Sequence, residues 1–173
     1  MKVFLTGAPG SGKSTVLMNI VEILREKGLK IGGIVTPEIR SGRRRIGFGV
    51  KDVFSCEEGI LARVDEKVGP KVGKYTINLE SFEKIALPAL DFAFENCDLV
   101  VIDEIGKMEA FSKRFMEKVF EILSSKKKVL AVLHRNFVSE FKSFGRVIEV
   151  TEKNRDVLPQ ELVKYFLSGS AQN

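Results

Sequence analysis

A glycine-rich segment near the start of the chain carries the strongest chemical signal in the sequence. Residues 7–14 read GAPGSGKS and match the pattern G-x-x-x-x-G-K-[ST]. Glycines at these positions let successive backbone N–H groups point at one anion, and the amino end of a following helix adds partial positive charge. Lys13 can then place its ammonium group on the β- and γ-phosphates of a nucleotide, and Ser14 can offer its hydroxyl to Mg²⁺. The motif predicts a triphosphate site, with Thr15 beside the α-phosphate.

A pair of carboxylates follows an apolar run in the middle of the chain. Residues 99–103 read LVVID, and Glu104 comes next. Such a run is typical of a buried parallel strand, which would carry Asp103 at its carboxyl end. There Asp103 could hold Mg²⁺, usually through water, and Glu104 could activate or orient a water behind the γ-phosphate. Alone, the pattern could equally be a strand or helix cap, but together with the glycine-rich segment it predicts a catalytic acidic pair.

The elements that must position these groups follow from hydrophobic periodicity. Gly28 is expected to end the first helix, and Pro88 is expected to kink or interrupt the second. Alternating strands and helices indicate a mostly parallel sheet with helices on both faces and right-handed crossovers. The predicted strands are 2–6, 31–35, 99–103, 128–133 and 146–150, and the predicted helices are 14–27, 81–96, 113–124, 137–141 and 159–167. Residues 36–79 combine turn signals with a broken period-two pattern, which predicts a β-hairpin insertion in a single α/β domain spanning 1–173.

Composition limits the possible classes of protein. The chain has 173 residues, 44% of them hydrophobic and 29% charged, which excludes a collagen, a disordered tail and a disulfide scaffold. The formal net charge of +5 is too small to indicate a nucleic acid partner, although it does not exclude one. Cys56 and Cys97 lack zinc-site spacing, and no apolar run reaches membrane-spanning length. We therefore expect a cytoplasmic protein with no membrane association and no obligate protein partner.

Several basic residues are weaker candidates for the site. Residues 40–45 hold four arginines. One of them could neutralise transition-state charge, and Arg43 and Arg44 are the candidates. A solvated turn is the simpler interpretation of each. Lys107 could return toward the phosphates or stay solvated. Asn154 and Arg155 follow the last predicted strand, where they could flank the base or ribose or cap a helix.

Two further titratable residues have open roles. His134 follows a predicted parallel strand, where it could sense the γ-phosphate or position water, but a structural or exposed histidine is the simpler expectation. Glu109 follows the acidic pair by a few residues and could return toward the phosphates or lie at the surface, of which the surface position is the simpler expectation.

These segments resemble a known family. They are similar to the nucleoside-triphosphatase family first met in thermophiles, which has a human cancer-related counterpart. Four segments carry the resemblance: the phosphate loop, Thr36-Pro-Glu-Ile-Arg40, residues 101–109 (VIDEIGKME) and Asn154-Arg-Asp156. The stretch DEIGKME is the distinctive one, and the landmarks run in order over nearly the whole chain.

The resemblance implies a fold and a set of site residues. The fold would be the RecA-like variant of the P-loop NTPase three-layer sandwich, in which another strand separates the phosphate-loop strand from the Asp103 strand. Lys13 and Glu104 would be catalytic, and Ser14 and Asp103 would bind the metal. Two segments would bind nucleotide: Gly7, Ala8, Pro9, Gly10, Ser11, Gly12, Lys13, Ser14 and Thr15, then Leu99, Val100, Val101, Ile102, Asp103, Glu104, Ile105 and Gly106.

The same resemblance implies an activity: Mg²⁺-dependent hydrolysis of ATP, GTP and other nucleoside triphosphates to diphosphate and phosphate, with broad base specificity. Two alternatives remain open. A small P-loop nucleotide or metabolite kinase would use the same phosphate loop, with the arginine hairpin as a lid. A nucleic-acid-binding module switched by nucleoside triphosphate would also need that loop, but the chain leaves little room for a separate binding domain.

Overall fold

The apolar runs of the sequence form the centre of one ten-stranded sheet. In the computed structural model, which describes residues 1–168, the strand order is β10-β1-β9-β8-β2-β4-β5-β7-β6, with β3 paired to β4. The strands are β1 (Lys2–Thr6), β2 (Ile31–Val35), β3 (Glu38–Ser41), β4 (Arg44–Asp52), β5 (Glu58–Arg63), β6 (Lys71–Val72), β7 (Tyr75–Ile77), β8 (Leu99–Ile105), β9 (Lys128–Leu133) and β10 (Arg146–Glu149). The helices are α1 (Lys13–Glu26), α2 (Leu79–Asn96), α3 (Lys113–Ser124), α4 (Val138–Phe141) and α5 (Leu158–Ser168), with short 3₁₀ turns η1 (Glu109–Phe111) and η2 (Arg135–Phe137).

The order of the parallel strands brings the two candidate segments to one edge. Strand β1 pairs in parallel with β9 and β10, and β8 pairs in parallel with β9 and β2. Strand β9 therefore separates β1, which leads into the phosphate loop, from β8, which carries Asp103. This is the RecA-like order that was predicted. Because the carboxyl ends of parallel strands meet at the same edge, the loop and the acidic pair face one crevice.

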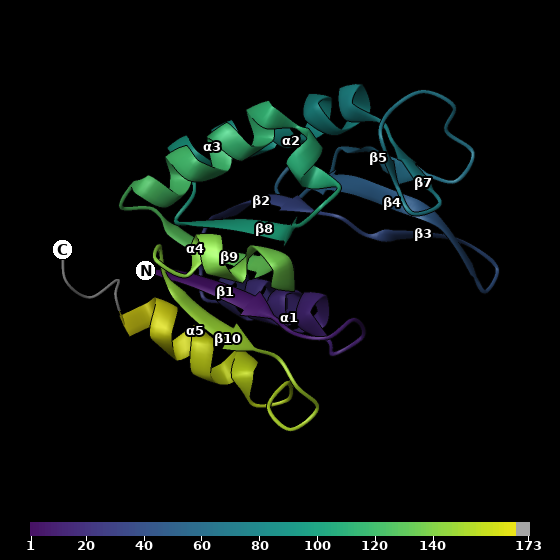
Figure 1. The fold of residues 1–173 in the computed structure, drawn as a ribbon. Helices are drawn as coiled ribbons and strands as arrows, with labels where there is room; N and C mark the ends of the chain where they lie inside the picture. The colour runs from purple at the N-terminus through teal and green to yellow at the C-terminus, as the bar shows by residue number, and fades with distance from the viewer. Residues whose placement is uncertain (169–173) are drawn as a thin grey trace.

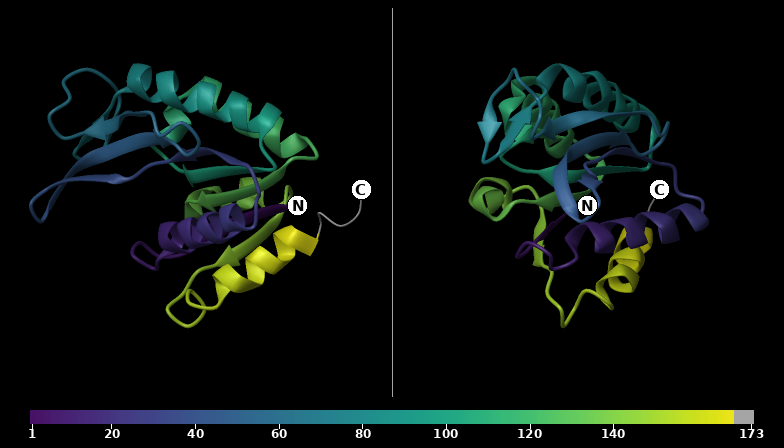
Figure 2. Two further views of the ribbon diagram at one scale, coloured as in Figure 1. Left: turned by 180° about the vertical axis from the view of Figure 1, so that it is seen from behind. Right: turned by 90° about the vertical axis from the view of Figure 1, so that its right-hand side faces the viewer.

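Helices cover both faces of the sheet, as predicted. Figures 1 and 2 show α1 and α5 on one face and α2 and α3 on the other. The alternation along β1 explains how one strand serves both layers: Phe4 packs in the core beneath α2 and α3, whereas Val3 and Leu5 pack against α1 and α5. All three side chains are fully buried.

The predicted β-rich insertion is present as strands β3 to β7. Strand β4 pairs antiparallel with β2, and the remaining strands add hairpins that extend the sheet to one side of the molecule (Figure 1). The insertion thus forms a wall beyond the carboxyl ends of β2 and β8.

Helix α2 differs from its prediction in two respects. It begins at Leu79 because the Asn78 side chain accepts a hydrogen bond from the backbone N–H of Ser81 at 2.9 Å. Pro88 lies inside the continuous helix, so of the two predicted effects, a kink or an interruption, the interruption is wrong. The proline is exposed, while Ala86 and Ala89 on either side are buried against the sheet. This packing outweighs the cost of about 3 kcal/mol of an internal proline.

Gly33 allows β2 and β8 to pack at close range. It adopts a φ of +124°, and a Cβ there would overlap the carbonyl oxygen of Val101. We expect Gly33→Ala to lower the free energy of unfolding by roughly 3 kcal/mol or more, because strained backbone and steric overlap add. Gly28→Ala is the matched control: it also has a positive φ, of +87°, but open space around it, so its cost should be only about 1 kcal/mol. Urea unfolding of both variants measures this, and equal losses would contradict the explanation.

Within residues 1–168, no helix combines the length and the apolar character that crossing a membrane requires.

Candidate active site

The phosphate loop is built on three glycines with left-handed backbone. Gly7, Gly10 and Gly12 have φ values of +142°, +76° and +99°, which only glycine adopts without strain. At Gly7 a Cβ would also lie 2.6 Å from the carbonyl oxygen of Val150. The loop ends at Lys13, where α1 begins, so the partial positive end of that helix points into the crevice.

Two polar side chains of the loop are arranged as an anion site would need. The Lys13 ammonium group donates hydrogen bonds to the carbonyl oxygens of Gly7 at 3.3 Å and Ala8 at 2.9 Å, which hold it over the loop. The Ser11 hydroxyl is buried and has no hydrogen-bond partner in the described part of the chain. A buried polar atom without a partner is costly, and a phosphate oxygen in the loop would satisfy it.

Asp103 and Ser14 meet across the crevice. The Ser14 hydroxyl donates a hydrogen bond to Oδ1 of Asp103 at 3.2 Å, and the Thr36 hydroxyl donates to the Asp103 carbonyl oxygen at 2.7 Å. Burial raises the pKa of Asp103 to about 6, while the Ser14 hydrogen bond and Lys13 oppose the rise. A cation bound here would favour the charged carboxylate.

The donor set fits Mg²⁺. A hydroxyl, one carboxylate and the phosphates of a substrate match the way this ion is held, with water completing its shell. Within residues 1–168, no cluster of three or more His, Cys, Asp or Glu side chains forms an all-protein metal site. Any metal at Asp103 would therefore be shared with the substrate.

Glu104 extends the acidic pair toward the far side of the crevice. Burial raises the pKa of its carboxyl, and His134 and Lys13 partly offset this by favouring the charged form. His134 lines the same cleft, donates its backbone N–H to the carbonyl oxygen of Ile105 at 3.0 Å, and accepts at Nδ1 from the backbone N–H of Asn136 at 3.3 Å. The histidine thus lies at the site while its own turn holds it in place.

Glu109 is buried, so the expectation of a surface position is wrong. Its side chain is only 5% exposed, and burial raises the pKa of its carboxyl to about 8. Hydrogen bonds from the backbone N–H groups of Glu109 and Gly106 favour the charged form and partly offset this rise. The turn at Gly106 brings this carboxyl close to Glu104: a Cβ at Gly106 would lie 3.0 Å from an oxygen of each. The short 3₁₀ turn after β8 folds Glu109 back into the cleft, which sequence periodicity does not reveal.

The buried Glu109 carboxyl should make stability depend on pH. Between the ordinary pKa of 4.5 and about 8, the native state holds a proton that the unfolded chain has lost. Stability should therefore fall as pH rises through this window, by about 1 kcal/mol per pH unit, and level off above it. Glu109→Gln stays neutral at every pH. Urea unfolding in EDTA from pH 5 to 9 should show the parent losing stability relative to Glu109→Gln, and a constant difference would show that Glu109 does not hold this proton.

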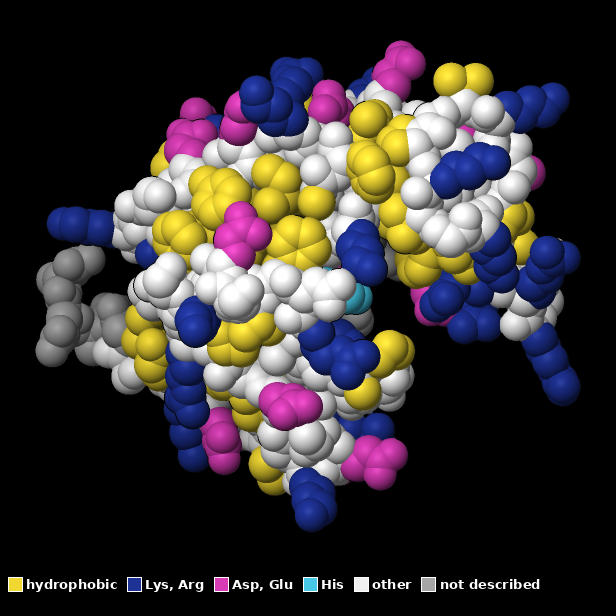
Figure 3. Space-filling view, in the orientation of Figure 1, with side chains coloured by type: hydrophobic (Ala, Val, Ile, Leu, Met, Phe, Trp, Pro, Cys, Tyr) yellow, Lys and Arg dark blue, Asp and Glu magenta, His cyan; other side chains and the backbone are white. Residues whose placement is uncertain are grey.

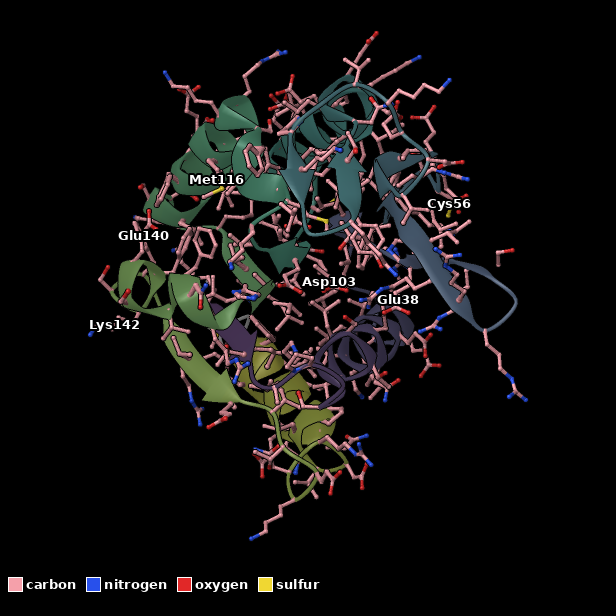
Figure 4. The ribbon with its side chains drawn as sticks, turned by 45° about the vertical axis from the view of Figure 1, so that its right-hand side comes forward. Glu38, Cys56, Asp103, Met116, Glu140 and Lys142 are labelled. Atoms are coloured by element: carbon pink, nitrogen blue, oxygen red, sulfur yellow. The ribbon has the colours of Figure 1, made fainter. Side chains whose placement is uncertain are left out.

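The candidate residues open onto one cleft of about 680 Å³. Figure 4 shows Asp103 and Glu38 near its centre, where β8 faces the insertion. The lining comprises Pro9, Gly10, Gly12, Lys13, Ser14, Thr15, Thr36, Pro37, Glu38, Arg45, Phe48, Leu61, Val72, Asp103, Glu104, Lys107, Met108, Glu109 and His134. The cleft therefore runs from the phosphate loop, past the acidic pair, to the wall formed by the insertion.

The two predicted nucleotide-binding segments contribute differently. In the first segment, residues 7–15, three members form part of the phosphate loop but do not line the cleft: Gly7, Ala8 and Ser11. Of the second, only Asp103 and Glu104 line the cleft. The remaining members are buried in or just after β8, where they form the scaffold: Leu99, Val100, Val101, Ile102, Ile105 and Gly106.

The basic candidates are separated by the structure. Arg43 and Arg44 lie exposed at the β3–β4 turn and do not line the cleft, whereas Arg45 does. Arg45 donates hydrogen bonds to the Tyr75 hydroxyl at 2.9 Å and to Glu38 at 2.8 Å, which fix its guanidinium against the insertion. Lys107, a sequence candidate, also lines the cleft.

The last loop candidates lie at the other end of the phosphate loop. The Cδ of Arg155 would be 3.5 Å from a Cβ at Gly12, so this side chain borders the loop. The Asn154 side chain accepts from the N–H of Thr151 at 2.8 Å and donates to the carbonyl of Glu149 at 2.9 Å. Asn154 thus shapes its own turn.

Sequence reasoning missed Thr36 and Glu38 as site residues. Thr36 directly follows β2, whose last residue pairs with Asp103, so its place at the same sheet edge could have been inferred from the parallel order. Glu38 reaches the cleft through the fold of the insertion, for which periodicity gives no signal.

Comparisons with known proteins agree with this geometry. A family model described as NTPase matches residues 2–163. The chain is 42% identical to nucleoside-triphosphatase THEP1 of Methanocaldococcus jannaschii, over 98% of this chain and 99% of that protein. It is 45% identical to nucleoside-triphosphatase THEP1 of Methanosarcina barkeri, over 96% and 97%.

Two solved structures share the fold. The crystal structure of THEP1 from Aquifex aeolicus superposes with a TM-score of 0.85 and 32% identity, covering 96% of this chain and 99% of that chain. The solution structure of a human cancer-related nucleoside triphosphatase gives a TM-score of 0.80 and 36% identity, covering 99% of both. Since the family match spans the phosphate loop, the acidic pair and the insertion together, the chain belongs to this NTPase family.

Proposed function

We propose that the protein hydrolyses nucleoside triphosphates to diphosphates and phosphate in the presence of Mg²⁺. The observation that carries the proposal is the meeting of Ser14 and Asp103 at 3.2 Å, with Lys13 and Glu104 in the same cleft. This arrangement supports a phosphate cradle, a metal-holding pair and a base that act at one point. The names of its relatives support the same reaction class.

Each residue has a distinct task in this reaction. The loop N–H groups and Lys13, released from its carbonyl partners, hold the β- and γ-phosphates. Ser14 and Asp103 would hold Mg²⁺, which neutralises the charge that develops on the leaving diphosphate. Glu104 orients a water molecule and accepts its proton as the bond from water oxygen to the γ-phosphorus forms and the bridging bond to the β-phosphate breaks.

The cleft supports broad base specificity. Asn154 and Arg155, the residues placed to flank a base, do not line it. The free thiols Cys56 and Cys97 support our expectation that the protein works in the reducing cytoplasm.

Phosphate release from ATP, GTP, CTP and UTP tests this proposal. We expect rates within about tenfold of one another, because no strong base contact discriminates them. Removing Mg²⁺ with EDTA should slow release by roughly 10²-fold or more, because the charge on the leaving group is then unbalanced. Equal rates with and without EDTA would contradict the metal's role.

The same assay separates the two alternatives. Stoichiometric transfer of the γ-phosphate to an added nucleoside or nucleoside monophosphate would indicate a kinase. Many-fold stimulation by RNA or DNA at physiological salt would indicate a nucleic-acid-binding module. The proposed hydrolase shows neither.

A further inference from the structure

A second cavity of about 470 Å³ opens beside the active-site cleft. It is lined by Lys71, Val72, Lys107, Ala110, Phe111 and Phe137, which come from the β6–β7 hairpin and from the turns that follow β8 and β9. Val72 and Lys107 line both this outer cavity and the cleft. The outer cavity therefore adjoins the end of the cleft that the insertion borders, and hydrolysis by water gives it no task.

Two aromatic rings form its apolar surface. Phe111 is 47% exposed and makes no ring contact within residues 1–168, so its ring is open to a ligand. Phe137 is half-buried and is supported from behind by Phe141, at 6.3 Å between ring centroids. Figure 3 shows hydrophobic side chains on both sides of a hollow in this face, with Lys or Arg side chains between them.

Two lysines supply positive charge to the same cavity. Both Lys71 and Lys107 are exposed, and among residues 1–168 neither forms an ion pair or a side-chain hydrogen bond. Several other basic side chains nearby are paired with carboxylates, as Arg45 is with Glu38. Apolar rings with free ammonium groups beside them complement a ligand with an aromatic body and an anionic group.

We propose that the outer cavity binds a small organic anion with an aromatic body, stacked on Phe111 and Phe137 and paired with Lys71 and Lys107. A small molecule fits better than a protein segment because the outer cavity is small, open to solvent on one side and has one strongly exposed aromatic residue. Since Lys107 also lines the cleft, an anion that pairs with its ammonium group removes positive charge from the nucleotide site. The ligand is therefore an effector that slows hydrolysis, a consequence that rests on the proposed function, whereas the binding does not.

Binding can be tested with three indoles that differ in charge. Indole-3-acetate, neutral indole-3-acetamide and cationic tryptamine are titrated, without nucleotide, into ¹⁵N-labelled protein while amide shifts are followed. We expect indole-3-acetate to bind at least about fivefold more tightly than the amide, and tryptamine to bind most weakly. The shifts should be confined to residues 71–72, 107–111 and 135–137. Equal affinities, or shifts elsewhere, would overturn the proposal.

Variants at the cavity sharpen this result. Phe111→Ser should weaken indole-3-acetate binding by about tenfold through lost apolar contact, and Lys71→Glu by about fivefold through charge reversal. Lys74→Glu, on the same hairpin but outside the cavity, is the matched control and should change affinity by less than about twofold. Loss of binding in the control as well would attribute the effect to net charge. Dimerisation of the parent that Phe111→Ser abolishes would assign the surface to a second copy of the chain and overturn the proposal.

The effector role has a separate readout. Saturating indole-3-acetate should reduce phosphate release at saturating Mg·ATP by at least about twofold in the parent, because an anion paired with Lys107 lowers the positive charge of the cleft in which the triphosphate binds. Phe111→Ser should show the same basal rate and no inhibition. Binding without inhibition would overturn the effector role. Inactivity of the parent without ligand would instead count against the proposed function and leave the binding result standing.

Discussion

Replacing Glu104 with glutamine should reduce phosphate release by roughly 10²-fold or more while Mg·NTP binding persists. Glutamine keeps the shape and the hydrogen-bonding reach of the side chain but cannot accept the proton of the attacking water. The raised pKa of the Glu104 carboxyl, caused by burial, makes it a better base than an exposed glutamate. Single-turnover phosphate release, with nucleotide affinity measured in parallel, separates the chemical step from binding.

The matched control for this variant is Glu22→Gln, an exposed glutamate on α1 outside the cleft, which should leave the rate unchanged. If Glu104→Gln releases phosphate within about threefold of the parent, Glu104 is not the group that activates water, since loss of a general base costs far more.

Replacing Lys13 with alanine should have the second large effect. Its ammonium group is the only cation of the phosphate loop itself, and no neutral side chain can substitute for it at the γ-phosphate. We expect phosphate release at saturating nucleotide to fall by roughly 10²- to 10³-fold, with weaker nucleotide binding in addition. Steady-state kinetics over a wide range of Mg·ATP concentration measures both effects.

Stability should not explain the loss. Within residues 1–168, Lys13 donates only to the carbonyl oxygens of Gly7 and Ala8, so thermal unfolding of the variant should match the parent. Lys84→Ala is the control for removal of a positive charge, because Lys84 is exposed on α2 and forms no ion pair with any residue that the structure describes. A Lys13→Ala protein that retains full turnover would show that phosphate is stabilised elsewhere.

The core of the fold could be predicted because its signals are local. Alternation and apolar runs mark β1, β2, β8 and β9, since these strands are buried on one or both faces. The position of β9 between β1 and β8 is not a local property, and it followed only from resemblance to the family. Pro88 shows the opposite case: a local rule predicted a kink or an interruption, and α2, packed on the sheet, continues through the proline.

The candidate site also combines residues that the local sequence indicates with residues that only the fold positions. The phosphate loop and the acidic pair could be predicted because each is a set of contiguous residues whose types indicate its chemistry. Glu109 was misjudged because the Gly106 turn, and not the chain's periodicity, decides that it points inward. Arg45 could not be separated from Arg43 and Arg44 in advance, because they are adjacent in sequence and only the pairing of β3 with β4 directs one of them to the cleft.

A crystal structure of the protein with Mg²⁺ and a non-hydrolysable ATP analogue tests the central claim most directly. We predict the β- and γ-phosphates inside the loop of residues 7–14, the metal on the Ser14 hydroxyl with Asp103 beside it, and a water molecule between Glu104 and the γ-phosphorus. A triphosphate bound outside that loop, or a Glu104 carboxylate turned away from the γ-phosphate, would contradict it.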